Sequence, residues 1–158
     1  MTPEELFEEG AFLLVKKQFT EAIEWLTRAI EADPGMAKAY QARAAAYLQL
    51  ERLDEAEADL NKALDLDPEN PRLYFRMGQI FYRRSQLAQK EEDKRGLLER
   101  ALEFFNRAID LEPMYAAAFM ARSQVYRDLG EEELADFDLD KAAAVQRELA
   151  KARKIVDF

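Results

Sequence analysis

The sequence predicts an all-α repeat protein, an α-solenoid of four helix-turn-helix repeats closed by a C-terminal capping helix. Pro34 and Pro68 stand 34 residues apart, and Ala22 and Ala56 keep the same spacing. A fixed period of this size is typical of stacked repeats. Within each repeat, apolar residues recur every three or four positions, which indicates amphipathic helices. Only five Gly and five Pro punctuate the 158 residues.

Aligned on this period, the repeats span 3–36, 37–70, 71–115 and 116–149, and residues 150–158 extend the last helix as a cap. Each of the first three repeats closes on a proline, which cannot continue a helix. Small residues occupy the positions where the two helices of a repeat must approach closely, because a larger side chain would push them apart. These residues are Gly10, Ala44, Gly78 and Ser123.

The third repeat is 45 residues long, and its 11 extra residues lie between Phe81 and Leu98. In one interpretation both of its helices are longer and turn near 90–93, with Leu87, Ala88, Leu97 and Leu98 lining the added contact. In the other, residues 86–96 form a polar loop. We favour the helical hairpin, because 85–90 has no helix breaker. A tolerated insertion at a surface tip without a binding role is the simplest interpretation of its function.

The last predicted helix runs from Glu131 to the end of the chain without Gly or Pro. An apolar stripe is expected to cover the final stacking face, which would otherwise meet water. The stripe consists of Leu139, Ala142, Leu149, Ala152 and Val156.

Composition excludes several kinds of function. The chain carries 23 Lys and Arg against 32 Asp and Glu, a formal charge of −9, and has no Cys and no His. The missing residue types exclude disulfides, Cys or His metal sites, and thiol or Ser–His catalysis. The acidic total argues against general nucleic-acid binding. No apolar run approaches the length of a membrane span, and no signal peptide is evident, so we expect a cytoplasmic protein.

No catalytic or metal-binding motif is recognisable. The acidic turn 65–69 lacks the glycine and the terminal Glu of a calcium loop. The alternating Asp136, Asp138 and Asp140 splay apart on a helix and are interpreted as a solvated face. We therefore expect no metal, no cofactor and no enzymatic activity.

The pattern of the repeats resembles the tetratricopeptide repeat family. In that family a bulky residue, a small residue and an aromatic mark the first helix, and Ala, a large apolar residue, Ala and Pro mark the second. The first repeat matches with Leu6, Gly10, Leu13, Ala22, Leu26, Ala29 and Pro34. The first helices of the others match with Tyr40, Ala44 and Tyr47, with Tyr74, Gly78 and Phe81, and with Phe119, Ser123 and Tyr126.

The resemblance implies a right-handed superhelix whose first helices line a concave groove. It places the groove positions of the first two repeats at Phe7, Ala11, Leu14, Lys38, Gln41, Ala45, Leu48 and Gln49. The predicted peptide-binding residues are Lys38, Gln41, Arg72, Phe75, Arg76, Gln79, Tyr82, Arg83, Met120, Gln124 and Arg127. Five cations and no acid lie between Glu69 and Glu91, so this groove is expected to be locally basic.

The sequence thus predicts a scaffold or adaptor that binds a peptide segment of another protein, acidic with an apolar anchor. A solvated basic face paired with acids of the second helices is the competing interpretation. Two alternative functions are a secretion-type or co-chaperone-like chaperone and a self-assembling structural scaffold, although a monomer is favoured. Some family members clamp a C-terminal carboxylate with Lys, Asn, Asn, Lys and Arg. The matching positions here are Phe7, Ala11, Ala42, Arg72 and Arg76, so the clamp is not supported.

Overall fold

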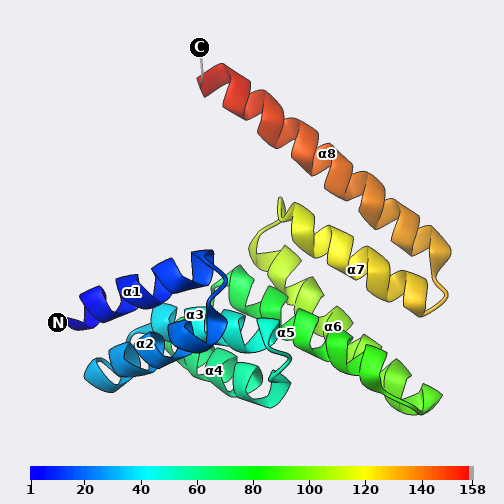
Figure 1. Ribbon diagram of the computed structural model, residues 1–158. Helices are drawn as coiled ribbons and strands as arrows, with labels where there is room; N and C mark the ends of the chain where they lie inside the picture. The colour runs from blue at the N-terminus through cyan, green and yellow to red at the C-terminus, as the bar shows by residue number, and fades with distance from the viewer. Residues whose placement is uncertain (157–158) are drawn as a thin grey trace. The chain divides into compact units, whose positions relative to one another are not determined.

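The chain folds entirely into helices over the part that its structure describes. A computed structural model describes residues 1–156 and contains eight α-helices and no strand in that range (Figure 1). The predicted all-α fold class is confirmed. The helices are α1 (Pro3–Val15), α2 (Phe19–Ala32), α3 (Ala37–Gln49), α4 (Leu53–Leu66), α5 (Pro71–Leu87), α6 (Glu91–Leu111), α7 (Ala116–Asp128) and α8 (Glu132–Val156).

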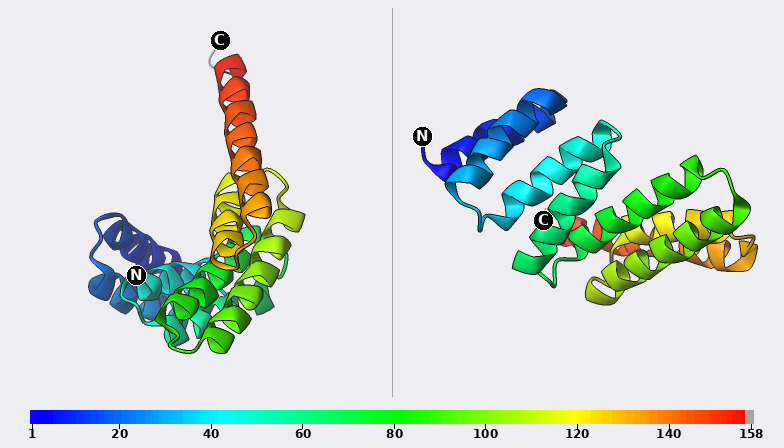
Figure 2. Two further views of the ribbon diagram at one scale, coloured as in Figure 1. Left: turned by 90° about the vertical axis from the view of Figure 1, so that its right-hand side faces the viewer. Right: turned by 90° about the horizontal axis from the view of Figure 1, so that it is seen from below.

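Two compact units make up the chain, Met1–Arg76 and Met77–Phe158. In the first, α1 packs on α2, α2 on α3 and α3 on α4; in the second, α6 packs on α7 and α7 on α8 (Figure 2). Two glycines allow this close packing. A Cβ on Gly10 would lie 2.6 Å from Leu26 Cγ, and one on Gly78 would lie 2.4 Å from Phe105 Cε1. The predicted small-residue positions are therefore true points of close approach in these two repeats.

The turns inside the first, second and fourth repeats each contain a residue in the left-handed region. Lys17, Glu51 and Gly130 all have positive φ, at 61°, 59° and 83°. Only Gly adopts this left-handed region without steric cost, so the two non-glycine residues carry local strain. The loops that close the first two repeats are held differently: the Tyr40 and Tyr74 hydroxyls donate to the carbonyls of Pro34 and Pro68.

Helix, not loop, makes up most of the eleven-residue insertion. α5 continues to Leu87 and α6 begins at Glu91, so the connection is 88–90 rather than the expected 90–93. Leu98 is buried, but Leu87 is 57% exposed, contrary to the expectation that it lines the contact. An open cleft of about 580 Å³ lies at this tip, lined by Arg84, Leu87, Ala88, Glu92, Asp93, Gly96 and Leu97.

The last helix is much longer than its partner α7, and Figure 1 shows it running past the end of α7. Its first half buries Ala135, Ala142 and Val145, whereas every residue from 146 to 155 is exposed. Leu139 and Leu149, which we expected in the apolar cap, are 42% and 46% exposed. The final two residues of the expected cap lie outside the described residues. No helix within residues 1–156 is long and apolar enough to span a membrane.

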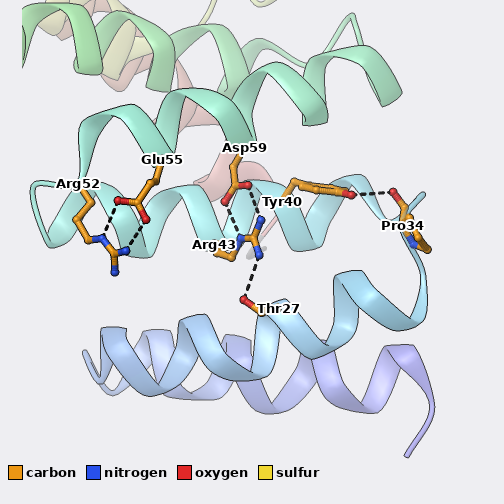
Figure 3. Close-up of polar contacts among 7 residues, drawn as sticks. All are labelled: Thr27, Pro34, Tyr40, Arg43, Arg52, Glu55 and Asp59. Atoms are coloured by element: carbon orange, nitrogen blue, oxygen red, sulfur yellow. Dashed lines mark hydrogen bonds and ion pairs between the residues drawn. The ribbon is translucent and has the colours of Figure 1, made fainter.

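A polar node joins three helices of the first unit. The Arg43 guanidinium of α3 donates to both carboxylate oxygens of Asp59 on α4, at 2.8 and 2.7 Å, and to Thr27 Oγ1 on α2, at 3.0 Å (Figure 3). Asp59 is only 5% exposed. The hydrogen bond with Asp59 raises the pKa of Arg43, so the guanidinium stays charged.

The second unit repeats this node with the corresponding residues. Arg122 of α7 donates to both oxygens of Asp138 on α8, at 2.7 and 2.8 Å, and to Asn106 Oδ1 on α6, at 3.0 Å. Asp138 is 1% exposed. The prediction of a solvated face was therefore wrong for Asp138, while Asp136 and Asp140 are exposed as expected.

Candidate functional site

In the first unit, the predicted basic residues differ in how their charge is balanced. Lys38 forms an ion pair with Glu4 of α1 and lies 4.6 Å from the Phe7 ring centroid. Its charge is thus already balanced by an exposed acid. Arg72 is exposed at the start of α5 and makes no ion pair within the described residues. Phe75 and Arg76 follow on α5 and are half-buried.

An open cleft of about 530 Å³ lies in the same unit. Its lining combines apolar side chains with two cations, Lys17 and Arg76. The full set is Leu14, Val15, Lys17, Phe19, Ala45, Gln49 and Arg76. Four of these, Leu14, Ala45, Gln49 and Arg76, are expected groove positions. A surface of this chemistry can hold an apolar side chain next to a carboxylate.

Sequence patterns did not reveal three residues of this cleft. Val15 is 82% exposed at the end of α1, Lys17 occupies the strained turn, and Phe19 begins α2. All three lie at or beyond the end of the first helix, so a search restricted to first-helix positions overlooks them. Val15 and Phe19 supply apolar area that the sequence pattern assigned to neither core nor groove.

Tyr82 and Gln124, two predicted residues of the second unit, meet at Asp128, which the family resemblance also places at a groove position. The Tyr82 hydroxyl and the Gln124 amide donate to the two carboxylate oxygens of Asp128, each at 2.9 Å. Burial, followed by the bond to Asp128, raises the pKa of Tyr82 to about 12. The result is a neutral phenol beside a carboxylate, rather than a basic patch.

The other predicted residues of this unit do not form one site. Arg83 donates to Gln86 at 3.2 Å. Arg127 lies 3.4 Å from Asp136 and 3.9 Å from Glu132 of α8, so acids of a second helix balance it. Met120 is 49% exposed and Gln79 is half-buried. For Arg127, this pairing matches the alternative of a basic face balanced by second-helix acids.

No group of three or more acidic residues within the described range could hold a metal ion. The polar contacts described above are hydrogen bonds and ion pairs within or between helices. The chemistry of these surfaces suits molecular recognition. The first unit has an apolar cleft with two cations, and the second has a phenol, an amide and a carboxylate.

Comparison with protein families identifies the repeats. A model described as "TPR repeat" matches residues 44–84, and one described as "Tetratricopeptide repeat" matches residues 11–36. Hsp70-Hsp90 organizing protein 1 of Glycine max is 34% identical over 110 residues, covering 70% of this chain and 17% of that protein. Small glutamine-rich tetratricopeptide repeat-containing protein 2 of Saccharomyces cerevisiae is 32% identical over 119 residues, covering 75% and 31%. The chain thus spans less than a third of either relative.

Solved structures show the same fold. TTC0263, a thermophilic TPR protein of Thermus thermophilus, superposes with a TM-score of 0.84 at 23% identity, covering 92% of this chain and 75% of that one. The first TPR of Spaghetti (RPAP3), bound to the HSP90 peptide SRMEEVD, superposes with a TM-score of 0.70 at 26% identity, covering 82% and 94%.

Proposed function

The chain belongs to the tetratricopeptide repeat family, and we propose that it binds, as a scaffold or adaptor, an acidic peptide segment with an apolar anchor. The observation that carries this proposal is the cleft of the first unit, where Val15 and Phe19 stand beside Lys17 and Arg76. Val15 and Phe19 hold the anchor, and the two cations hold a carboxylate. We further propose that the protein is cytoplasmic and performs no catalysis.

The remaining predicted residues extend this proposal. Arg72 offers a second guanidinium one helical turn from Arg76, at a spacing suited to consecutive acids. The second unit has predicted contacts of its own, with polar groups on Tyr82 and Gln124 and exposed apolar area on Met120. Each is a predicted contact that the experiment below can test by single substitution.

The test is peptide selection followed by measurement of affinity. Random peptides displayed on phage are selected against the immobilised protein, and the enriched sequences are measured by fluorescence anisotropy. Enriched peptides should be acidic and carry a large apolar residue. The double substitution Arg72→Glu/Arg76→Glu should weaken binding by about tenfold or more and flatten its salt dependence. Val15→Asp, at an exposed position, should weaken binding by removing apolar surface that contacts the peptide's anchor, without affecting folding.

The matched control is Lys62→Glu, which reverses an exposed charge on α4, a second helix, away from the cleft. It should leave affinity unchanged. Enrichment of basic peptides, or equal affinity of the wild type and the Arg72→Glu/Arg76→Glu protein, would show that the cleft is not the binding site.

A co-chaperone role is the second candidate, favoured by the similarity to Hsp70-Hsp90 organizing protein 1 and by the HSP90 peptide in the Spaghetti structure. It makes a different prediction, because a clamp for the terminal carboxylate depends on that group. If the chain acts in this way, SRMEEVD should bind and its C-terminally amidated form should not. Since Phe7, Ala11 and Ala42 occupy the Lys and Asn positions of the clamp, we expect amidation to change affinity little.

A further inference from the structure

The last helix exposes a face that is buried in the second helices of the other repeats. Leu139 of α8 is 42% exposed, whereas the residues at the same repeat position, Leu26, Leu60 and Phe105, are at most 1% exposed. In the α2–α3 and α6–α7 pairs, the second helix of one repeat is covered by the first helix of the next. Within the described residues, no helix follows α8, so α8 lacks a cover of this kind.

The two covered junctions share one polar contact. Arg43 of α3 donates to Thr27 of α2, and Arg122 of α7 donates to Asn106 of α6, each at 3.0 Å. In both junctions, an arginine of the covering first helix donates a hydrogen bond to a side chain of the second helix that it covers. The residue of α8 at the position of Thr27 and Asn106 is Asp140.

Asp140 is an acceptor of the same kind but with a full charge. Its side chain is exposed and forms no ion pair within residues 1–156. A carboxylate binds a guanidinium more strongly than a hydroxyl or an amide oxygen does. Asp136, Leu139, Asp140 and Ala143 recur at helical spacing and so form one surface, which we call the α8 docking face. It combines an apolar centre with two acids.

We propose that the α8 docking face binds an amphipathic helix of a partner protein that carries an arginine or lysine within an apolar stripe. The partner helix takes the place that α3 takes on α2 and α7 takes on α6. Its cation meets Asp140, and its apolar residues cover Leu139. This contact is separate from the peptide cleft of the first unit, so it adds a second partner to the proposed function.

A second copy of this chain is the wrong occupant. Within residues 1–156, α1 is a first helix that no described helix precedes, and it carries Glu9 at the position of Arg43 and Arg122. Stacking α1 on α8 would set Glu9 against Asp140, and Glu5 would add a further exposed acid. Like charges in such a contact are repulsive, so a basic helix from another protein fits and α1 does not.

The test uses a peptide copy of α7, one of the chain's own covering helices, as a probe. A fluorescent, lactam-stapled peptide with the sequence 115–128, the α7 segment that contains Arg122, is titrated into the protein of residues 1–158 and followed by anisotropy. Saturable binding is expected. Asp140→Lys in the protein should weaken it about tenfold, and so should Arg122→Glu in the peptide. Combining the two reversed partners should restore much of the affinity.

The control Glu148→Lys makes the same charge change on the exposed tail of α8 and should leave binding unchanged. Far-ultraviolet circular dichroism of each variant checks that folding is intact. If the peptide fails to bind saturably, the proposal is overturned, since the face would then act only as a polar cap. Binding that is insensitive to Asp140→Lys would also overturn it, because the peptide would then occupy another site, such as that of α7 itself.

Discussion

Single residues decide how closely the helices of a repeat can pack. Gly78 lies against the ring of Phe105, and a methyl group there has no room. Gly96 of α6 is a useful contrast, because a Cβ built on it meets nothing within 4 Å. The two glycines therefore serve different purposes, although both lie inside helices.

Replacing each by alanine should give opposite results. Gly78→Ala should lower the free energy of unfolding by about 1–3 kcal/mol, because the added methyl group overpacks the contact with Phe105. Gly96→Ala should raise it by about 0.5–1 kcal/mol, since alanine is the better helix former. Urea denaturation followed by circular dichroism measures both. Equal effects of the two substitutions would contradict the close approach at Gly78.

The Tyr82 phenol gives a residue-scale prediction for alkaline pH. Its folded-state pKa of about 12 lies above the ordinary value of 10.0. Between these values the folded protein keeps a proton that the unfolded chain loses, so this group's contribution to stability is present below pH 10 and is lost as pH rises through 12.

An ultraviolet titration of the phenolate tests the contact. The wild type should show an ionisation step near pH 12, and Tyr82→Phe should remove that late step. Asp128→Asn should bring the step to lower pH, because the carboxylate adds to the effect of burial. An unchanged titration of Asp128→Asn would mean that the hydrogen bond does not form in solution.

At the scale of elements, the polar nodes occupy repeat positions that hold apolar residues elsewhere in the chain. The second and fourth repeats hold Arg43–Asp59 and Arg122–Asp138, and the third repeat has Met77 and Phe104 at these positions. The same two positions thus accept an ion pair in two repeats and two apolar side chains in the third.

Removing one partner of a node should lower the free energy of unfolding strongly, whereas replacing both partners together should lower it little. Arg122→Met alone leaves the Asp138 carboxylate buried without its partner, which should cost about 3–5 kcal/mol. The double substitution Arg122→Met/Asp138→Phe copies the third repeat and should recover most of that loss. Thermal and chemical denaturation of the single and double variants provide the double-mutant cycle. Additive losses would show that the node is not a coupled unit.

The sequence was informative about helices and less so about side-chain partners. The period and the prolines predicted the all-α fold, because both are properties of the backbone and of apolar faces. Asp138 was misread as solvated, since the alternating acids of 136–140 hide that one of them faces inward. The repeated separation of sixteen residues in Arg43–Asp59 and Arg122–Asp138 was the signal that could have identified the pair. Val15 was missed because no periodic rule of the groove positions marks the last residue of a first helix.

At the scale of the whole molecule, charge opposes the joining of the two ends of the array. With Glu9 on α1 and Asp140 on α8, wild-type protein should remain monomeric over a wide concentration series in light scattering. Glu9→Arg supplies the cation that α3 and α7 use, so it should promote association, and adding Asp140→Lys should abolish it. Wild-type protein that assembles with rising concentration would contradict this prediction and favour the self-assembling scaffold.

The three-helix nodes also set the axial register of the helices. Apolar side chains tolerate sliding, because one methyl group can replace another. A guanidinium that must meet two carboxylate oxygens and a third acceptor at once has a single position along the helix axis. Slipping by one turn, about 5.4 Å, would break all three bonds. Arg43 and Arg122 therefore fix their helices in one axial position. Pulling such a repeat apart should require an abrupt rupture rather than gradual sliding.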